Sequence, residues 1–380
     1  MKIDPLIRHK LIDVLLTIIL WIISVRMLVM IIYFGAGNSF GFLDSESKAL
    51  MILARDLTNI SLAGFIIGLL TGFSEQFVFP TKFKNKPVYK LIVAKVWVYL
   101  VSMSIATIVT LYIYQCQYSG KTFAEFMVFM QGHFLSRTFF IVTGVGLLIS
   151  MEVNLVLFIR NKLGYGIAFP IIIGRYHNPR EEDRIFIFID LKSSVEIAEK
   201  LSPINYSKFL QDCFHDLEEV VIRHKGQIYQ YVGDECVITW KVKKKTDFNH
   251  PIRLFYEFKN LLLTKKSVYE DTYGIVPQFK GAIHAGVVST AEVGGDIKSE
   301  IAFHGDVLNT TACVMELCKK FNEDLLITDV MLSRAKLVPN EFRITSKDIV
   351  ELRGKHIRHK VCAIGEAIPE PKKILTKVTF

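Results

Sequence analysis

The chain has 380 residues and a mean hydropathy of +0.33, with 51% hydrophobic and 22% charged residues, which excludes a disordered chain, a collagen-like repeat and a disulfide-rich miniprotein. This length is enough for two domains. The formal net charge is +9, and in so apolar a chain we attribute it to basic cytoplasmic loops facing anionic lipid rather than to nucleic-acid binding.

The first half of the chain carries four apolar runs, each long enough to cross a bilayer, for which about 20 residues suffice. The runs cover residues 11–34, 57–79, 91–115 and 138–159. We therefore predict a membrane domain of four transmembrane helices over residues 1–162. Glu75 and Lys95 lie near the ends of these runs, where we expect their charges to reach the membrane interface. Arg26 and Glu152 lie deeper, and either pair with each other or line a ligand pocket.

Lysine and arginine are concentrated in three segments that flank these runs: the N-terminus, the loop after the second run and the exit from the fourth. Cytoplasmic loops carry an excess of these residues. The sequence therefore predicts a multi-pass protein of the cell inner membrane, with both termini in the cytoplasm.

Residues 163–183 are predicted to connect the two halves. The apolar run at 163–174 is too short to span a bilayer, and the polar, proline-containing stretch after it marks a domain boundary. We expect the second domain to cover residues 184–380.

The second domain alternates short apolar runs of strand character with helical patterns. Predicted strands cover residues 185–190, 227–232, 235–240, 279–289 and 325–328; predicted helices begin at Ser194 and cover 206–224, 249–265 and 306–321. Gly233 and Asp234, between the second and third strands, signal a hairpin. The order β-α-α-β-β-α-β-α-β fits an α+β, ferredoxin-like split βαβ sheet with helices packed on one face.

Two aspartates stand at turns where a carboxylate could hold a metal ion. Asp190 ends the first predicted strand just before a helix, and Asp234 lies at the tip of the hairpin. Two carboxylates from neighbouring strands can hold two metals that clamp the attacking and leaving oxygens in phosphoryl chemistry. Taken singly, each aspartate is more often a simple turn residue.

Four ordered segments carry a more specific signal: FIDLKSS at 188–194, YVGDE at 231–235, GAIHAGVVS at 281–289 and HGDVLNTTA at 304–312. Together they resemble the catalytic domain of class III nucleotidyl cyclases over residues 184–364. The resemblance implies a membrane-anchored cyclase that converts ATP or GTP to the 3′,5′-cyclic nucleotide and pyrophosphate, and the function that we favour is an adenylate cyclase that makes cyclic AMP. It also implies two Mg²⁺ or Mn²⁺ ions per site and a homodimer with its active sites between the two catalytic domains.

The resemblance assigns roles to individual residues. Asp190 and Asp234 match the metal-binding pair, and Asn309 and Lys355 match residues that orient the ribose and contact the triphosphate. The segment expected to wrap the phosphates consists of Leu191, Lys192, Ser193 and Ser194. The metal aspartates would come from one subunit and Asn309 from the other. The alternatives are a surface amide on a helix for Asn309 and a solvated hairpin lysine for Lys355.

Two departures from the family pattern leave alternatives open. Cys313 stands where the family usually has an arginine that stabilises the transition state, and a thiol cannot replace a guanidinium fork. The base-reading positions hold Gln230 and Ala302, and an amide can read either purine edge. We favour ATP because bacterial members are mostly adenylate cyclases. A guanylate cyclase and a catalytically weak, cyclase-like receptor are the alternatives, and we expect the lipid bilayer but no nucleic acid as a partner.

Overall fold

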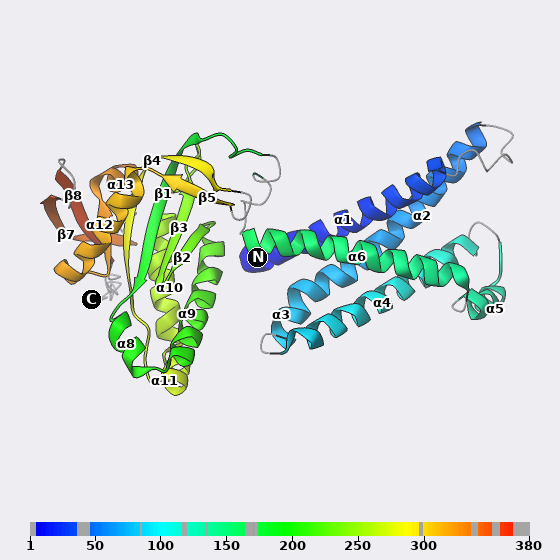
Figure 1. Ribbon diagram of the computed structural model, residues 1–380, viewed down its shortest axis with the longest axis horizontal. Coiled ribbons are helices and arrows are strands. Elements are labelled where there is room, and N and C mark those ends of the chain that lie inside the picture. Colours follow the sequence, from blue (N-terminus) through cyan, green and yellow to red (C-terminus); the bar gives the residue numbers. More distant parts are fainter. Residues whose placement is uncertain are drawn as a thin grey trace, which may run out of the picture. The chain divides into compact units, whose positions relative to one another are not determined.

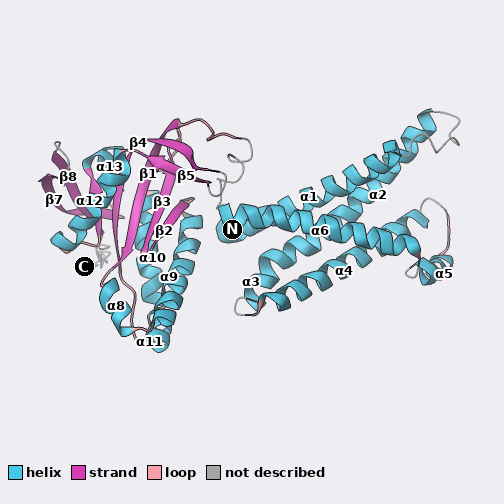
Figure 2. Ribbon diagram, in the orientation of Figure 1, coloured by secondary structure: helices cyan, strands magenta, loops and turns pink. Residues whose placement is uncertain are grey.

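The computed structural model describes residues 5–35, 46–83, 86–115, 120–133, 136–163, 170, 174–295, 299–335, 341–351 and 358–367. It divides into two compact units, Met1–Lys162 and Leu163–Phe380. The first unit is helical, whereas the second combines helices and strands (Figure 2).

The first unit is built from long apolar helices (Figure 1). Its elements are α1 (Pro5–Gly35), α2 (Glu46–Phe73), a π-helical turn η1 (Ser74–Val78), α3 (Phe79–Lys82), α4 (Val88–Ile113), α5 (Phe123–His133) and α6 (Arg137–Leu163). Four stretches are long and apolar enough to cross a membrane: Leu6–Ile31, Leu57–Lys82, Tyr89–Ile113 and Phe139–Ile159. The four predicted spans are thus confirmed as helices. The additional helix α5 has 11 residues and is too short to span.

Helices α1 and α2 approach each other closely because three glycines on α2 face α1. A Cβ added to Gly68 would lie 2.6 Å from Cα of Ile18, and one added to Gly64 would lie 3.0 Å from Cα of Ile22. Gly72 continues the four-residue spacing against Thr17. Small residues at this spacing allow helix backbones to pack in direct contact within a membrane.

A polar cluster joins three helices of this unit. Lys95 on α4 forms an ion pair of 2.8 Å with Glu75, which lies in the π-helical turn η1. Tyr99 donates a hydrogen bond of 2.7 Å to Glu75, and Asn154 on α6 donates one of 2.6 Å to the Tyr99 oxygen. Glu75 and Lys95, which we expected at the membrane interface, therefore pair with each other within the bundle.

The second unit is an eight-stranded sheet covered by helices (Figure 1). Its strands are β1 (Arg180–Leu191), β2 (Gln227–Val232), β3 (Glu235–Lys241), β4 (Phe279–Gly294), β5 (Ser299–His304), β6 (Leu325–Thr328), β7 (Phe342–Glu351) and β8 (Arg358–Glu366). The strand order is β2-β3-β1-β4-β6-β8-β7, and β5 pairs with β4. Its helices are α8 (Ser194–Lys200), α9 (Pro203–Arg223), α10 (His250–Thr264), α11 (Lys266–Tyr273), α12 (Asp306–Phe321) and α13 (Asp329–Arg334).

Both faces of this sheet are buried, which corrects the expectation that helices cover one face. Along β1, Ile185, Ile187 and Ile189 pack into a core with α9 and α10, whereas Phe186 and Phe188 pack into a second core with α12. Alternate residues of a strand point to opposite faces, so a continuous apolar run is the pattern of a strand buried on both sides. The predicted α+β fold is otherwise confirmed, with β5, β7, β8, α11 and α13 as elements that the sequence did not reveal.

Candidate active site

Strand pairing brings three charged residues into one row across the centre of the sheet. Asp190, near the end of β1, lies opposite Glu235 of β3 on one side and opposite Lys280 of β4 on the other. The Lys280 ammonium forms an ion pair of 2.9 Å with the Asp190 carboxylate. Asp234 directly precedes Glu235 in the β2–β3 turn, where Gly233 has a φ of +63°. The hairpin therefore delivers Asp234 to the same end of the sheet as Asp190.

The electrostatics of this group show that its acidic side chains lie close together. Burial raises the pKa of Asp190, the Lys280 ammonium opposes that shift, and the charge and a hydrogen bond of Asp234 add to it. Burial, followed by the charges of Asp190 and Asp234, raises the pKa of Glu235 to about 7. Burial and the same two aspartates raise the pKa of the nearby Tyr206 phenol. Crowded carboxylates of this kind are typical of functional sites that attract a cation or a proton.

The sequence interpretation missed Glu235, Lys280 and Tyr206 as members of this group. Glu235 carried a signal, since it directly follows Asp234 in the hairpin motif. Lys280 and Tyr206 carried none, because only the strand register and the packing of α9 bring them to Asp190.

The segment expected to wrap phosphates lines a cavity of about 380 Å³ next to Asp190. Lys192, Ser193 and Ser194 line it together with Lys280 and Lys319. Ser193 has a φ of +55°, a left-handed conformation that turns the chain sharply into α8. Leu191 also borders the cavity, but its side chain is buried in the core. Three lysines around a cavity beside paired aspartates make it suitable for a polyanion that carries a metal ion.

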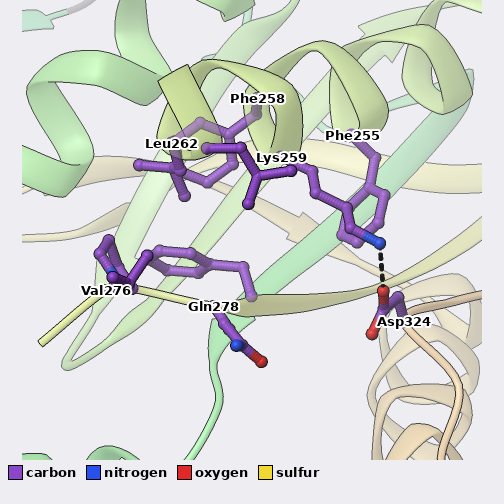
Figure 3. Close-up of a pocket in the computed structure, with 10 residues that line it drawn as sticks. Phe255, Phe258, Lys259, Leu262, Val276, Gln278 and Asp324 are labelled. Carbon is purple, nitrogen blue, oxygen red and sulfur yellow. Dashed lines mark hydrogen bonds and ion pairs between the residues drawn. The ribbon is translucent and has the colours of Figure 1, made fainter. Parts of the chain in front are cut away.

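Lys192 is held by an ion pair with Asp324, which lies between α12 and β6. The other oxygen of Asp324 forms an ion pair of 2.6 Å with Lys259 of α10 (Figure 3). Asp324 also borders a second, more apolar cavity of about 250 Å³, into which Phe255 and Phe258 of α10 project (Figure 3). The position of the Lys192 ammonium is therefore coupled to the packing of α10.

Of the remaining predicted site residues, those that the structure describes do not line the cavity at Asp190. Asn309 is exposed in the first turn of α12, and Cys313 lies half-buried one turn later, against the core that contains Val314. Gln230 is exposed on the edge strand β2, and Ala302 is half-buried on β5. Lys355 lies outside the described residues. Within one copy, the structure therefore brings together the aspartates and the 191–194 segment, but it does not bring Asn309, Cys313, Gln230 or Ala302 to them.

The donor set at Asp190 and Asp234 fits a hard divalent cation. Among the described residues, no three His, Cys, Asp or Glu side chains form a preformed metal cage. Mg²⁺ is commonly held by one or two carboxylates, with water and substrate phosphates as its other ligands. Paired carboxylates beside a lysine-lined cavity match that mode of binding. Burial is the main cause of the raised Asp190 pKa, and a cation would relieve the repulsion from Asp234 that adds to it.

Sequence comparison relates the second unit to known proteins. Residues 177–364 match the family described as the adenylate and guanylate cyclase catalytic domain. The chain is 34% identical over 181 residues to adenylate cyclase 2 of Rhizobium meliloti (strain 1021), an alignment that covers 48% of this chain and 50% of that protein. It is 23% identical over 171 residues to an adenylate cyclase of Anabaena cylindrica, covering 44% and 34% of the two chains. The chain thus spans half or less of the length of these curated relatives.

The fold also matches a solved structure. A bacterial light-regulated adenylyl cyclase superposes with a TM-score of 0.50 at 15% sequence identity, covering 60% of this chain and 66% of that one. At this identity the match concerns the fold alone.

Proposed function

Since residues 177–364 belong to the adenylate and guanylate cyclase catalytic domain family, we propose that this protein is a membrane-anchored adenylate cyclase that converts ATP to 3′,5′-cyclic AMP and pyrophosphate. The observation that carries the proposal is the convergence of Asp190 and Asp234 beside a lysine-lined cavity. The 34% identity to an adenylate cyclase over the catalytic domain supports ATP as the nucleotide.

In this proposal Asp190 and Asp234 hold two divalent ions, Mg²⁺ or Mn²⁺, which lower the pKa of the ribose 3′-hydroxyl and neutralise the triphosphate when bound. Lys192 and Lys319 line the cavity and attract the phosphate oxygens. Lys280 neutralises Asp190 and so limits the repulsion between the carboxylates. The backbone of residues 191–194 follows the phosphates around the turn into α8.

A homodimer completes the site. Asn309 is exposed on α12 and does not line the cavity at Asp190, so it is available to a nucleotide held by a second copy. We assign it to orienting the ribose there, with Cys313 one helical turn behind it and Lys355 on the triphosphate. Gln230 and Ala302 would face the purine base. The exposed Gln230 amide can donate and accept hydrogen bonds, so guanylate cyclase is the first alternative.

A second candidate function is a catalytically weak, cyclase-like receptor, and Cys313 is the observation that favours it. A half-buried thiol provides no cation for charge that develops on the phosphates. The membrane location rests on the four apolar helices, and the distribution of lysine and arginine supports cytoplasmic termini.

The decisive experiment measures nucleotide turnover by the purified full-length protein with ATP or GTP and Mg²⁺ or Mn²⁺. Asp234→Ala is the test variant and Asp271→Ala, an exposed residue on α11, is the control. We expect cyclic AMP from the wild type and the control, and none from Asp234→Ala. Cyclic GMP would identify a guanylate cyclase, and the absence of product from a folded dimer would favour the receptor.

A further inference from the structure

A separate cavity of about 540 Å³ lies at the other end of β1 from Asp190. Its walls come from the segment before β1, the turn between α9 and β2, the end of β3 with the loop after it, and the start of α10. Arg184 on its wall is six residues from Asp190 along the strand, which corresponds to about 20 Å. The cavity is therefore distinct from the nucleotide site proposed above.

This cavity is strongly basic. Fifteen residues line it, and the only acid among them is Asp247. Its cations are Arg175, Arg184, Lys225, Lys241, Lys243 and Lys245.

The acidic side chains near the cavity, Asp247 and Glu182, already form ion pairs. Asp247 forms an ion pair of 2.7 Å with Arg253. The buried Glu182 pairs with both Arg184, at 2.8 Å, and Lys241. In the described part of the chain, none of the four remaining cations, Arg175, Lys225, Lys243 and Lys245, has an acidic partner. Unpaired cations around one cavity repel each other, and an anion in the cavity would relieve that repulsion.

Two further features favour an anion in this cavity. Helix α10 has 15 residues and begins at His250 on the cavity wall, so the positive end of its dipole faces the cavity. The wall also includes Thr246, whose hydroxyl accepts a hydrogen bond from the Lys243 backbone N–H and can donate one to an anion. Lysine and arginine side chains beside the positive end of a helix dipole are common ligands of a phosphate group.

The chain tethers this cavity to a membrane helix. Pro170 lines the cavity and is seven residues after Leu163, the last residue of α6. Seven residues of chain span at most about 25 Å. Basic clusters just beyond the cytoplasmic end of a transmembrane helix bind the headgroups of anionic lipids.

We propose that this cavity binds a phosphate group, and that the headgroup of an anionic phospholipid supplies it. The proposal rests on the membrane location and not on cyclase activity. Headgroup binding would hold the catalytic domain against the membrane surface through the turn at Lys225 and the loop at 243–247.

The test uses the full-length protein in nanodiscs of phosphatidylcholine, with or without phosphatidylglycerol, and measures amide hydrogen exchange over residues 224–250. The pocket variant is Lys225→Gln/Lys243→Gln/Lys245→Gln. The matched control, Lys200→Gln/Lys208→Gln/Lys320→Gln, removes the same charge from exposed lysines outside the cavity. Exchange in the β1 core verifies that both variants are folded.

We expect phosphatidylglycerol to slow exchange in the wild type and in the control, and the pocket variant to lose this protection. Inorganic phosphate added to phosphatidylcholine nanodiscs forms the second arm. Equal protection from free phosphate alone would overturn the lipid assignment. No protection from either probe, or equal loss in both variants, would overturn the site itself. Cyclic AMP formation is not part of this readout, so the outcome is independent of the proposed enzyme activity.

Discussion

At the scale of single residues, the carboxyl groups of the candidate active site lie close enough together to shift one another's pKa. Glu235 lies opposite Asp190 and next to Asp234, and burial with these two charges raises its pKa to about 7. A carboxyl that titrates near neutral pH links the state of the site to the pH of its surroundings.

We predict that Glu235 makes the stability of the protein depend on pH between about 4.5 and about 7. Its pKa in the folded state lies above the unfolded value, so its contribution to stability is complete below pH 4.5 and is lost as the pH rises to about 7. Glu235→Gln cannot ionise. The melting temperature of the wild type relative to this variant should therefore fall over that range. Thermal unfolding of the detergent-purified protein at a series of pH values measures it, and a difference independent of pH would refute the assignment.

A substitution at Cys313 distinguishes an active adenylate cyclase from a catalytically weak, cyclase-like receptor. One charge-assisted donor to a developing negative charge is commonly worth about a hundredfold in kcat. We expect Cys313→Arg to raise the kcat for cyclic AMP formation at least about tenfold. Cys313→Leu keeps the half-buried contact with the core around Val314 without adding charge, and should leave kcat unchanged. An unchanged kcat in Cys313→Arg would mean that another cation already serves the phosphates.

At the scale of elements, the close contact between α1 and α2 depends on the glycines of α2. Gly68 has no room for a Cβ, whereas nothing lies within 4 Å of the position that a Cβ would take at Gly144 on α6. Both are helical positions, so replacing either by alanine brings the same gain in helix propensity.

We therefore predict opposite effects for two identical substitutions. Gly68→Ala should destabilise the membrane unit by about 1–3 kcal/mol through overpacking against Ile18. Gly144→Ala should be neutral or slightly stabilising. Thermal unfolding in detergent, followed by helical circular dichroism, compares the two. Equal effects of both substitutions would show that the α1–α2 contact adjusts without cost.

The catalytic domain shows how elements position the site. β1 is buried on both faces and paired on both edges, so Asp190 projects from a strand that its neighbours hold firmly in place. The partner aspartate, Asp234, comes from the hairpin that joins the edge strand β2 to the internal strand β3. The two carboxylates therefore reach one end of the sheet from different elements, the end of β1 and the β2–β3 hairpin.

At the scale of the whole molecule, a homodimer with shared sites makes a quantitative prediction. Asp234→Ala and Asn309→Ala should each abolish activity alone. When the two variants are co-expressed, about half of the dimers are mixed, and each mixed dimer has one intact site of two. Activity should therefore recover to about a quarter of the wild-type value. A mixture as inactive as its components would place both residues in a site formed within one subunit.

The sequence by itself determined most of the elements that carry the motifs. The helix at 306–321 and the strand at 325–328 match the observed bounds, and Gly233 correctly marked the hairpin. These signals are local: helical periodicity, strand-forming runs and a glycine that tolerates a positive φ. The helix α13 has fewer than two turns, and the six residues of β5 do not alternate between apolar and polar side chains, so both elements stayed unseen.

What only the tertiary structure decided are the contacts between residues distant in the chain. Lys280 meets Asp190 because antiparallel pairing sets one register out of many, and Glu75 meets Lys95 because two helices pack side by side. The basic cavity around Lys225 is assembled from segments up to 80 residues apart. Local sequence patterns report the conformation of a segment, whereas a site depends on which segments the buried apolar faces bring together.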